Sequence, residues 1–342
     1  MRAAIIRAHG GLDAINIESV DDPKRAPGEV LVRVKALALN HMDLWARKGL
    51  PGFKFPLPLI PGCDMAGVVV EGEGVTPGTE VIIAPGYSCG RCEVCNSGRD
   101  NLCKRYGIFG EHRNGGCAEL VVVPRENLVP KPARLSWAEA AAYPLTFLTA
   151  WHMLVARANI RPGQTVLIHA AGSGVSSAAL QIARLHGAQI FATAGGADKC
   201  ARALSMGAEA AYDTRTDVDW SKAVFEATGK VGVDVVIDHV GKAFFEGSIR
   251  ALRPGGSFVT CGATSGSDVS VELRRVFFKN LSILGSTMGS RGELFELTRL
   301  VADGRLEPMV DRTFPLEAIR EAHAALEGRD VFGKIVVLMD PD

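Results

Sequence analysis

Apolar and polar positions alternate in short runs over the first third of the chain, a pattern that predicts β-strands. Gly and Pro separate these runs, and we expect strands at Ala3–Arg7, Ile15–Glu18, Glu29–Ala36, Ala66–Glu73 and Thr79–Ile83. A short helix is predicted at His41–Lys48, with Asn40 as its N-cap. From Cys89 to Cys103 the chain is polar and shows no periodicity. We therefore expect a loop there that something other than a hydrophobic core must order.

The pattern changes after Pro130-Lys131-Pro132. Helical periodicity at Ser136–Ala142 and Leu145–Ala158 is followed by strand-like runs that alternate with helix-like segments. The expected strands are Thr165–His169, Gln189–Thr193, Ala210–Asp213, Val233–Asp238 and Ser257–Cys261, and the first intervening helices are Gly174–His186 and one that starts at Asp198. This alternation predicts right-handed crossovers and a parallel sheet.

The C-terminal part departs from that rhythm. We expect a strand at Leu281–Gly285, helices at Glu293–Ala302 and Glu317–Glu327, and a closing strand at Lys334–Leu338. The whole pattern predicts an α/β protein with a doubly wound parallel sheet and a second, β-rich domain. The predicted boundaries are 1–130 for the first part of the β-rich domain, 131–272 for the parallel-sheet domain and 273–342 for a return to the β-rich domain.

Size and charge narrow the classes of function. The 342 residues are enough for two domains, and 47% hydrophobic with 22% charged residues is ordinary for a globular protein. A net charge of +0 gives no basic face for nucleic acid or a membrane surface. No stretch has the length of a membrane span or of a signal peptide. We therefore expect a cytoplasmic protein with a small-molecule substrate, and neither nucleic acid nor membrane as a partner.

Four of the eight cysteines fall within fifteen positions, as Cys89, Cys92, Cys95 and Cys103. Two-residue gaps let a tight loop bring successive sulfurs to one ion, and Gly90 and Gly98 give the backbone the freedom to do so. The alternative is a set of free or redox-active thiols. Because four thiolates leave no open coordination position, the spacing predicts one structural zinc in a lobe at 89–103.

A small-residue turn follows the first strand of the alternating region, as Ala171, Gly172, Ser173, Gly174 and Val175. Such a turn lets backbone N–H groups and a helix N-terminus approach a dinucleotide pyrophosphate. The alternative is a turn that needs small residues for packing alone. Its place within a βαβ series favours a cofactor site.

The second strand ends near Ala194, where an NAD site usually has a carboxylate for the ribose hydroxyls. Lys199 and Arg202 follow and could bind a 2′-phosphate, although they could also be the solvated face of a helix. We therefore expect NADP(H) in preference to NAD(H). Val240 and Gly262 follow later strands, at the carboxyl edge where ligands bind parallel sheets.

Together these features resemble the medium-chain dehydrogenase/reductases, the group of zinc-type alcohol dehydrogenases and quinone oxidoreductases. The further markers of the resemblance are Gly28–Val32, Asn40–Asp43, Pro61–Gly67, Gly116–Glu119, Thr149–Trp151 and Gly333–Val336. The resemblance implies that the β-rich part is a GroES-like catalytic domain and the parallel-sheet part a Rossmann dinucleotide-binding domain. It also implies an active site in the cleft between the domains and a homodimer or homotetramer that pairs near Val276–Gly289. It also implies nicotinamide-side contacts near Val240 and Gly262, and a cofactor contact from Lys334.

The resemblance further implies a catalytic zinc held by Cys, then His-Glu, then Cys or Asp. Here Asn40 stands at the first position, Cys63-Asp64 replace His-Glu, and Leu145 falls near the third. Since Asn is a poor zinc ligand and Leu is none, we expect that the catalytic zinc has been lost.

Without a Lewis acid, an unactivated alcohol is a poor substrate. We therefore predict NAD(P)(H)-dependent hydride transfer to a carbonyl, a quinone or an activated alkene. Asn40 is the candidate for polarising the carbonyl, or else only an N-cap. Asp64 could position substrate or neutralise a buried cation, His41 could relay a proton or be structural, and Cys63 could line the pocket. The alternatives are an alcohol dehydrogenase with a rebuilt metal site and a non-catalytic, dinucleotide-binding redox sensor.

Overall fold

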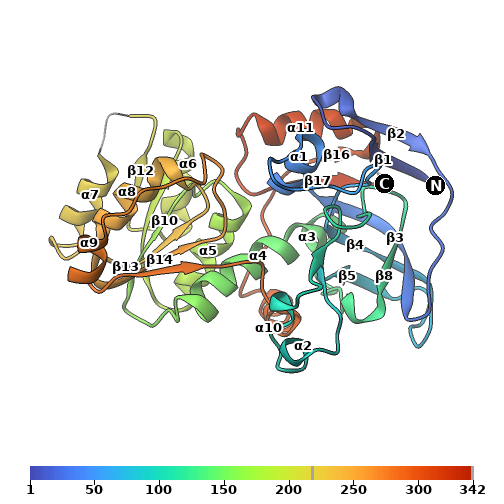
Figure 1. Ribbon diagram of the computed structural model, residues 1–342, viewed down its shortest axis with the longest axis horizontal. Coiled ribbons are helices and arrows are strands. Elements are labelled where there is room, and N and C mark those ends of the chain that lie inside the picture. The colour runs from blue at the N-terminus through green and yellow to red at the C-terminus, as the bar shows by residue number, and fades with distance from the viewer. Residues whose placement is uncertain (217–218, 340–342) are drawn as a thin grey trace. The chain divides into compact units, whose positions relative to one another are not determined.

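The computed structural model describes residues 1–216 and 219–339. It divides into two compact units, one formed by Met1–Leu148 with Ser290–Asp342 and the other by Thr149–Gly289 (Figure 1). The first unit is the predicted β-rich catalytic domain and the second is the Rossmann domain. The predicted α/β fold class is confirmed.

The catalytic unit contains a seven-stranded sheet in the order β16-β17-β3-β4-β5-β9, with β8 also paired to β3. All these pairs are antiparallel except the parallel pair β16–β17. The long strand β3 alternates buried and less buried positions, so Val30, Val32 and Val34 enter the core. The strands of this sheet are β3 (Glu29–Ala38), β4 (Asp64–Gly72), β5 (Glu80–Ile83), β8 (Leu120–Pro124), β9 (Leu128–Pro130), β16 (Val310–Pro315) and β17 (Lys334–Leu338).

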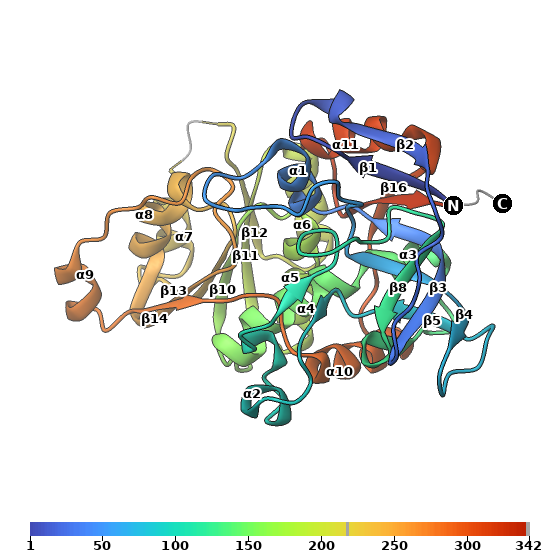
Figure 2. The same cartoon turned by 45° about the vertical axis from the view of Figure 1, so that its right-hand side comes forward.

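Two small antiparallel pairs complete the strands of this unit, namely β1 (Arg2–Ile6) with β2 (Ile15–Ser19) and β6 (Gly86–Tyr87) with β7 (Gly107–Ile108). Its helices are α1 (His41–Lys48), α2 (Glu93–Asn96), α3 (Trp137–Ala142), α4 (Pro144–Trp151, which runs on into the second unit), α10 (Arg291–Ala302) and α11 (Ile319–Glu327). Short 3₁₀ turns lie at Leu12–Ala14, Asp100–Leu102, Arg125–Asn127 and Leu316–Ala318. The loop that carries α2 lies beside α10 in both views (Figures 1 and 2), and the Arg291 N–H donates to Asp100 Oδ1 there.

The Rossmann unit is a six-stranded sheet in the order β12-β11-β10-β13-β14-β15, with every pair parallel. Its central strands are apolar on both faces, as expected for a parallel sheet covered by helices on each side. The strands are β10 (Thr165–Ile168), β11 (Gln189–Ala194), β12 (Ala210–Asp213), β13 (Val233–Asp238), β14 (Leu252–Thr260) and β15 (Ser282–Gly285). The helices are α5 (Gly174–Leu185), α6 (Ala197–Ser205), α7 (Trp220–Ala227), α8 (Lys242–Ala251) and α9 (Leu273–Phe278), after a π-helical turn at His152–Arg157.

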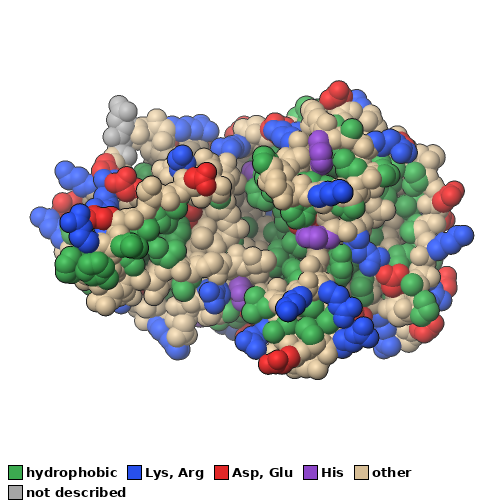
Figure 3. All heavy atoms as spheres, viewed as in Figure 1, with side chains coloured by type: hydrophobic (Ala, Val, Ile, Leu, Met, Phe, Trp, Pro, Cys, Tyr) green, Lys and Arg blue, Asp and Glu red, His purple; other side chains and the backbone are tan. Residues whose placement is uncertain are grey.

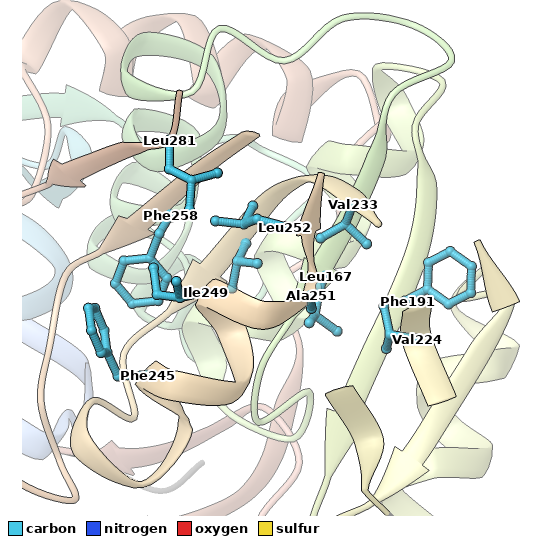
Figure 4. Packing of buried hydrophobic residues seen from close by; sticks show 11 residues of the cluster. Leu167, Phe191, Val224, Val233, Phe245, Ile249, Ala251, Leu252, Phe258 and Leu281 are labelled. Carbon is cyan, nitrogen blue, oxygen red and sulfur yellow. The ribbon is translucent and has the colours of Figure 1, made fainter. Parts of the chain in front are cut away.

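One part of the Rossmann core lies between the sheet and helices α7 and α8 (Figure 4). Phe245 and Ile249 of α8 pack on Phe258 of β14, and the Phe245 and Phe258 rings meet edge-to-face at 5.2 Å. This cluster fixes α8 against the strands whose carboxyl ends carry the predicted cofactor contacts.

The observed boundaries differ from the predicted ones at 130 and 272. Helix α3 stays with the catalytic unit because it packs on β3 and β4. Segment 273–289 stays with the Rossmann unit because β15 extends the parallel sheet beside β14. Strands β8, β9 and β16 were not predicted, since their positions depend on pairing with other strands. Among the described residues, no helix is both long and apolar enough to span a membrane.

Candidate functional site

The four clustered cysteines converge on one point of the catalytic unit. Their sulfur atoms all lie within 4.8 Å of one another, with Cys92 Sγ at 3.4 Å from Cys95 Sγ and 3.7 Å from Cys103 Sγ. Tetrahedral zinc with bonds of about 2.3 Å requires sulfurs about 3.8 Å apart. The backbone N–H of Arg105 points at the Cys103 sulfur at 3.3 Å, as amides do toward thiolates. The donor set and its spacing therefore fit a zinc ion.

The local chain explains this convergence. Gly90 and Gly98 have φ values of +68° and +75°, a region that other residues enter with strain, so each lets the loop reverse between ligands. Helix α2 is one turn long and brings Cys92 and Cys95 to the same side. Among the described residues, no other group of three or more His, Cys, Asp or Glu side chains lies close enough to share a metal ion.

A second polar cluster lies at the end of strand β3 and the start of β4. Asn40 Nδ2 donates to Asp64 Oδ2 at 2.9 Å and lies 3.6 Å from Cys63 Sγ. The backbone N–H of Leu145 donates to Asp64 Oδ1 at 2.7 Å. The four residues that align with the catalytic zinc ligands of the resembled family are therefore together in space.

The ammonium of Lys334 lies in the middle of this group. It donates to the carbonyl of Leu39 at 2.7 Å, to Asp64 Oδ2 at 3.1 Å and to Asn40 Oδ1. The side chain of Lys334 is 5% exposed and that of Asp64 is 0% exposed. Since a buried carboxylate requires a compensating charge, Lys334 neutralises Asp64.

These residues do not fit a catalytic zinc. Asp64 Oδ2 is already bound by an ammonium and an amide, and Leu145 offers only a backbone N–H. That leaves the Cys63 thiol, 3.6 Å from Asn40 Nδ2, as the one available ligand of the group, and a single ligand does not hold zinc. The position is occupied by a protein cation instead.

The contacts of Asn40 indicate a structural role beside the catalytic role predicted for it. It is the N-cap of α1, as expected, and its backbone N–H donates to Asp43 Oδ2 at 2.7 Å. Its side-chain amide accepts from Lys334 and donates to Asp64, so it is largely committed within the protein. Direct polarisation of a substrate carbonyl by Asn40 stays a prediction, and its observed contacts are those of a positioning group.

His41 and Asp43 lie on the first turn of α1. Burial, and then the charges of Arg329 and Lys334, lower the pKa of His41, so its imidazole is neutral near pH 7. Burial raises the pKa of Asp43 to about 6. Neither shift tests the proton relay predicted for His41, which stays a prediction.

Sequence reasoning missed Glu111. This carboxyl follows β7 on a loop next to the cluster, and burial, followed by the charge of Asp43, raises its pKa to about 7. The density of Gly at positions 110, 115 and 116 was the available signal, because it marks a loop that approaches other backbone closely.

In the Rossmann unit, the predicted small-residue turn joins β10 to α5. Ser173 is the N-cap of α5 and its hydroxyl accepts the Ser176 N–H at 3.1 Å. His239 Nε2 lies 2.9 Å from Ser173 Oγ and 3.0 Å from Ser176 Oγ. Ser173 and Ser176 are thus held against His239, which directly follows β13. Ala171, Gly172, Gly174 and Val175 lie in the same turn and helix start.

Val240 and Gly262 also lie where predicted, directly beyond the strand ends of β13 and β14. The N–H of Val240 donates to Asp238 Oδ1 at 3.1 Å, and burial raises the pKa of Asp238 to about 6. Lys199 lies on α6. Lys334, predicted to contact the cofactor, instead has its ammonium bound to three oxygens of the catalytic unit, and its cofactor contact stays a prediction.

Two charged groups, Asp213 at the end of β12 and Arg215 just after it, lie beside the end of β11, where the sequence did not place them. Asp213, at the end of β12, accepts the Gly196 N–H at 2.8 Å and the Arg215 N–H at 2.9 Å. The guanidinium of Arg215 lies over the turn, 3.2 Å from where a side chain on Gly196 would begin. A carboxylate is therefore present beside Ala194, contributed by the neighbouring strand, together with an exposed cation.

Comparison with known proteins assigns each of the two units to a dehydrogenase domain family. Residues 26–133 match the alcohol dehydrogenase GroES-like domain and residues 174–303 match the zinc-binding dehydrogenase domain. The chain is 32% identical to an alcohol dehydrogenase of Geobacillus stearothermophilus, over 99% of this chain and 100% of that protein. It is also 32% identical to the acryloyl-coenzyme A reductase of Metallosphaera sedula, over 98% and 99% of the two chains.

Among solved structures, one described as an NAD-dependent alcohol dehydrogenase matches with a TM-score of 0.95 and 51% identity, over 99% of this chain and 100% of the other. A crotonyl-CoA carboxylase/reductase in complex with NADP matches with a TM-score of 0.91 and 29% identity, over 99% and 94% of the two chains.

Proposed function

The chain belongs to the medium-chain dehydrogenase/reductase superfamily of NAD(P)-dependent oxidoreductases, and from that premise we propose that it reduces a carbon–carbon double bond conjugated to a carbonyl, without a catalytic metal. The observation that carries this proposal is the Lys334 ammonium hydrogen-bonded to Asn40 and Asp64. The Lys334 ammonium is a fixed cation whose charge Asp64 already neutralises. Because Asn40 and Asp64 are both bound to this ammonium, they are not available as ligands for a Lewis-acidic metal ion.

The chemistry of the two reaction types explains the choice. Oxidation of a simple alcohol requires stabilisation of an alkoxide, which a metal ion provides. Addition of hydride to a conjugated alkene places the developing charge on a carbonyl oxygen, which hydrogen-bond donors can stabilise. Bound NAD(P)H supplies the hydride. Asn40, Asp64 and Lys334 form a fixed, buried hydrogen-bonded cluster, and the Cys63 side chain is buried beside it.

Two kinds of relative bear on the proposal. The crotonyl-CoA reductase of Streptomyces collinus, 32% identical over 95% of this chain and 81% of that protein, has a name that describes reduction of a conjugated thioester. The acryloyl-coenzyme A reductase has such a name too. These names support α,β-unsaturated thioesters as the first substrates to test, with conjugated ketones and quinones as simpler probes.

Alcohol oxidation is the second candidate, because several relatives are named alcohol dehydrogenases, including the structure with 51% identity. The two functions are separated by comparing kcat/KM for crotonyl-CoA and cyclohexenone with NADPH or NADH against kcat/KM for primary alcohols with NADP⁺ or NAD⁺. We expect kcat/KM for alkene reduction to exceed kcat/KM for alcohol oxidation by at least about 100-fold, because loss of one group that stabilises the transition state typically costs a factor of this size. Faster alcohol oxidation that depends on a second equivalent of zinc would refute the proposal.

For the cofactor we infer NADP(H). Arg215 lies over the turn after Ala194, the region expected for the adenosine ribose, and helix α6, which follows this turn, carries Lys199 and Arg202. The Asp213 carboxylate accepts two backbone N–H groups, which lower its pKa and keep it ionised, and the adjacent Arg215 guanidinium offsets its charge.

We also infer a homo-oligomer that forms through the Rossmann unit. Strand β15 pairs with β14 on one side, and no described strand pairs with its other edge. Apolar side chains gather beside it on α9 and the preceding loop, in the region of α9 in Figure 3. Leu273 is 68% exposed and Phe278 is 76% exposed. An unpaired edge strand next to an apolar patch is suited to pairing with a second copy of the chain.

A further inference from the structure

The loop that carries Glu111 is fixed directly against the segment that carries Cys63. Asn114 Oδ1 accepts the N–H of Ile60 at 3.0 Å, and the Gly115 N–H donates to the carbonyl of Ile60 at 2.7 Å. A Cβ on Gly115 would lie only 1.9 Å from the carbonyl oxygen of Gly62, so no other residue permits this approach. The carboxyl of Glu111 is therefore held next to the polar cluster by backbone contacts.

The side chain of Glu111 differs from the other carboxyls of the cluster in having no hydrogen-bond donor among the described residues. The ring nitrogen His112 Nδ1 lies 3.8 Å from Glu111 Oε2, beyond hydrogen-bond distance. That nitrogen accepts the N–H of Ile108 at 3.2 Å, so in the neutral ring it carries no proton to donate to the carboxylate. With 14% of its side chain exposed, Glu111 is shielded from bulk water but still accessible.

The groups that face Glu111 disfavour its charged form. Burial has the largest effect, and the Asp43 carboxylate on α1 adds to it, so the pKa of Glu111 rises to about 7. The charge of Glu111 in turn contributes to the raised pKa of Cys63. The neighbouring His112 is neutral, because burial lowers its pKa, and the edge of its ring contacts Phe53 at 5.3 Å between centroids. The carboxyl thus changes its protonation near neutral pH in partly apolar surroundings.

The other ionisable groups of the cluster are committed to fixed contacts. The Asp64 carboxylate accepts from Asn40, Leu145 and Lys334, and the Lys334 ammonium donates to three oxygens. The Asp43 carboxylate accepts the backbone N–H of Asn40. Loss or gain of a proton at any of these would break a buried contact, whereas Glu111 can exchange its proton without doing so.

We propose that Glu111 donates the proton that completes alkene reduction, an inference that rests on the proposed function. Hydride from NAD(P)H forms the C–H bond at the β-carbon, the alkene π electrons move onto the carbonyl as an enolate, and NAD(P)⁺ is released. The O–H bond of Glu111 breaks as the α-carbon takes the proton, which leaves the saturated product and a carboxylate. Solvent returns the proton to Glu111 through its exposed edge.

The test uses the full-length, zinc-loaded enzyme with NADPH and crotonyl-CoA, and compares wild type with Glu111→Gln and Glu111→Asp. We expect kcat to fall at least about 100-fold in E111Q, the range for loss of a general acid, and less in E111D. The Kd for NADPH and the melting temperature should stay within error. Glu321→Gln is the matched control, since Glu321 is an exposed carboxyl on α11 of the same unit, and its kcat should not change.

Two further readouts separate proton donation from a structural role. The wild-type kcat should fall as pH rises above about 7, where Glu111 loses its proton, and this slope should vanish in E111Q. In D₂O, wild type should place deuterium on one face of the α-carbon, and E111Q should place it on both.

Distinct outcomes overturn the two proposals. A wild type with a flat pH profile, or an E111Q variant that keeps wild-type kcat and stereochemistry, removes Glu111 as the donor and leaves alkene reduction in place. A wild type that reduces no conjugated alkene overturns both.

Discussion

Replacement of Lys334 by Met tests whether the polar cluster depends on a buried ion pair. Lys334 Nζ donates three hydrogen bonds, and Lys334→Met removes all of them and leaves the fully buried Asp64 without its cation. Breaking a buried pair from one side costs about 3–5 kcal/mol. Because Asp64 keeps the donors Asn40 Nδ2 and Leu145 N, we expect the low end, about 3 kcal/mol.

The assay is thermal unfolding followed by calorimetry. For a domain of this size, a loss of about 3 kcal/mol lowers Tm by roughly 6–12 °C. The control is Lys48→Met, which removes an ammonium that is 45% exposed and paired with Glu327 at the surface, and which should cost under about 1 kcal/mol. The double variant K334M/D64N should be less destabilised than the sum of the two single variants by about 2 kcal/mol.

The result that would refute this reasoning is equally specific. If K334M lowers Tm no more than K48M, and the double variant shows additive effects, then Lys334 does not neutralise Asp64. Lys334 would then also not be the cation that stands in place of the catalytic metal.

Three other predictions concern separate parts of the molecule. Elemental mass spectrometry should find one zinc per subunit in wild type and in Cys63→Ser. In Cys103→Ser it should find less than about 0.2 zinc per subunit, because removal of one of the four ligands opens the site. Two zincs per subunit in wild type, with one lost in C63S, would contradict the assignment of a single structural zinc. Arg215→Ala should raise the KM for NADPH by about tenfold, because it removes one charge-assisted contact to the 2′-phosphate, and should leave the KM for NADH unchanged. Equal changes in the two KM values would show that Arg215 does not bind the phosphate. Phe278→Glu should convert the oligomer to a monomer, as measured by size-exclusion chromatography with light scattering. The control is Val231→Glu, which changes an apolar residue that is 57% exposed in the same unit and should leave the molar mass unchanged. A monomeric wild type would refute the interface.

Local sequence signals were sufficient for much of the fold. Alternation of strands and helices after residue 165 predicted the parallel sheet, because each element of such a sheet carries its own hydrophobic period. The helix start at Asn40 was readable for the same reason, since an N-cap acts within one turn. Strands β8, β9 and β16 were not predicted, and each is defined by its pairing with another strand of the sheet.

The sequence by itself determined the cysteine lobe, since ligand spacing within fifteen residues limits where four sulfurs can lie, and it located the turn that joins β10 to α5. It also showed that two of the positions aligned with catalytic-zinc ligands hold Asn40, a poor zinc ligand, and Leu145, which is none. Only the tertiary structure decided what replaces them. Lys334 and Asp64 are 270 positions apart, and Glu111 acquires its unusual pKa from burial and from Asp43 on another element. Charges and burial depend on distances in space, and no local pattern in the chain encodes them.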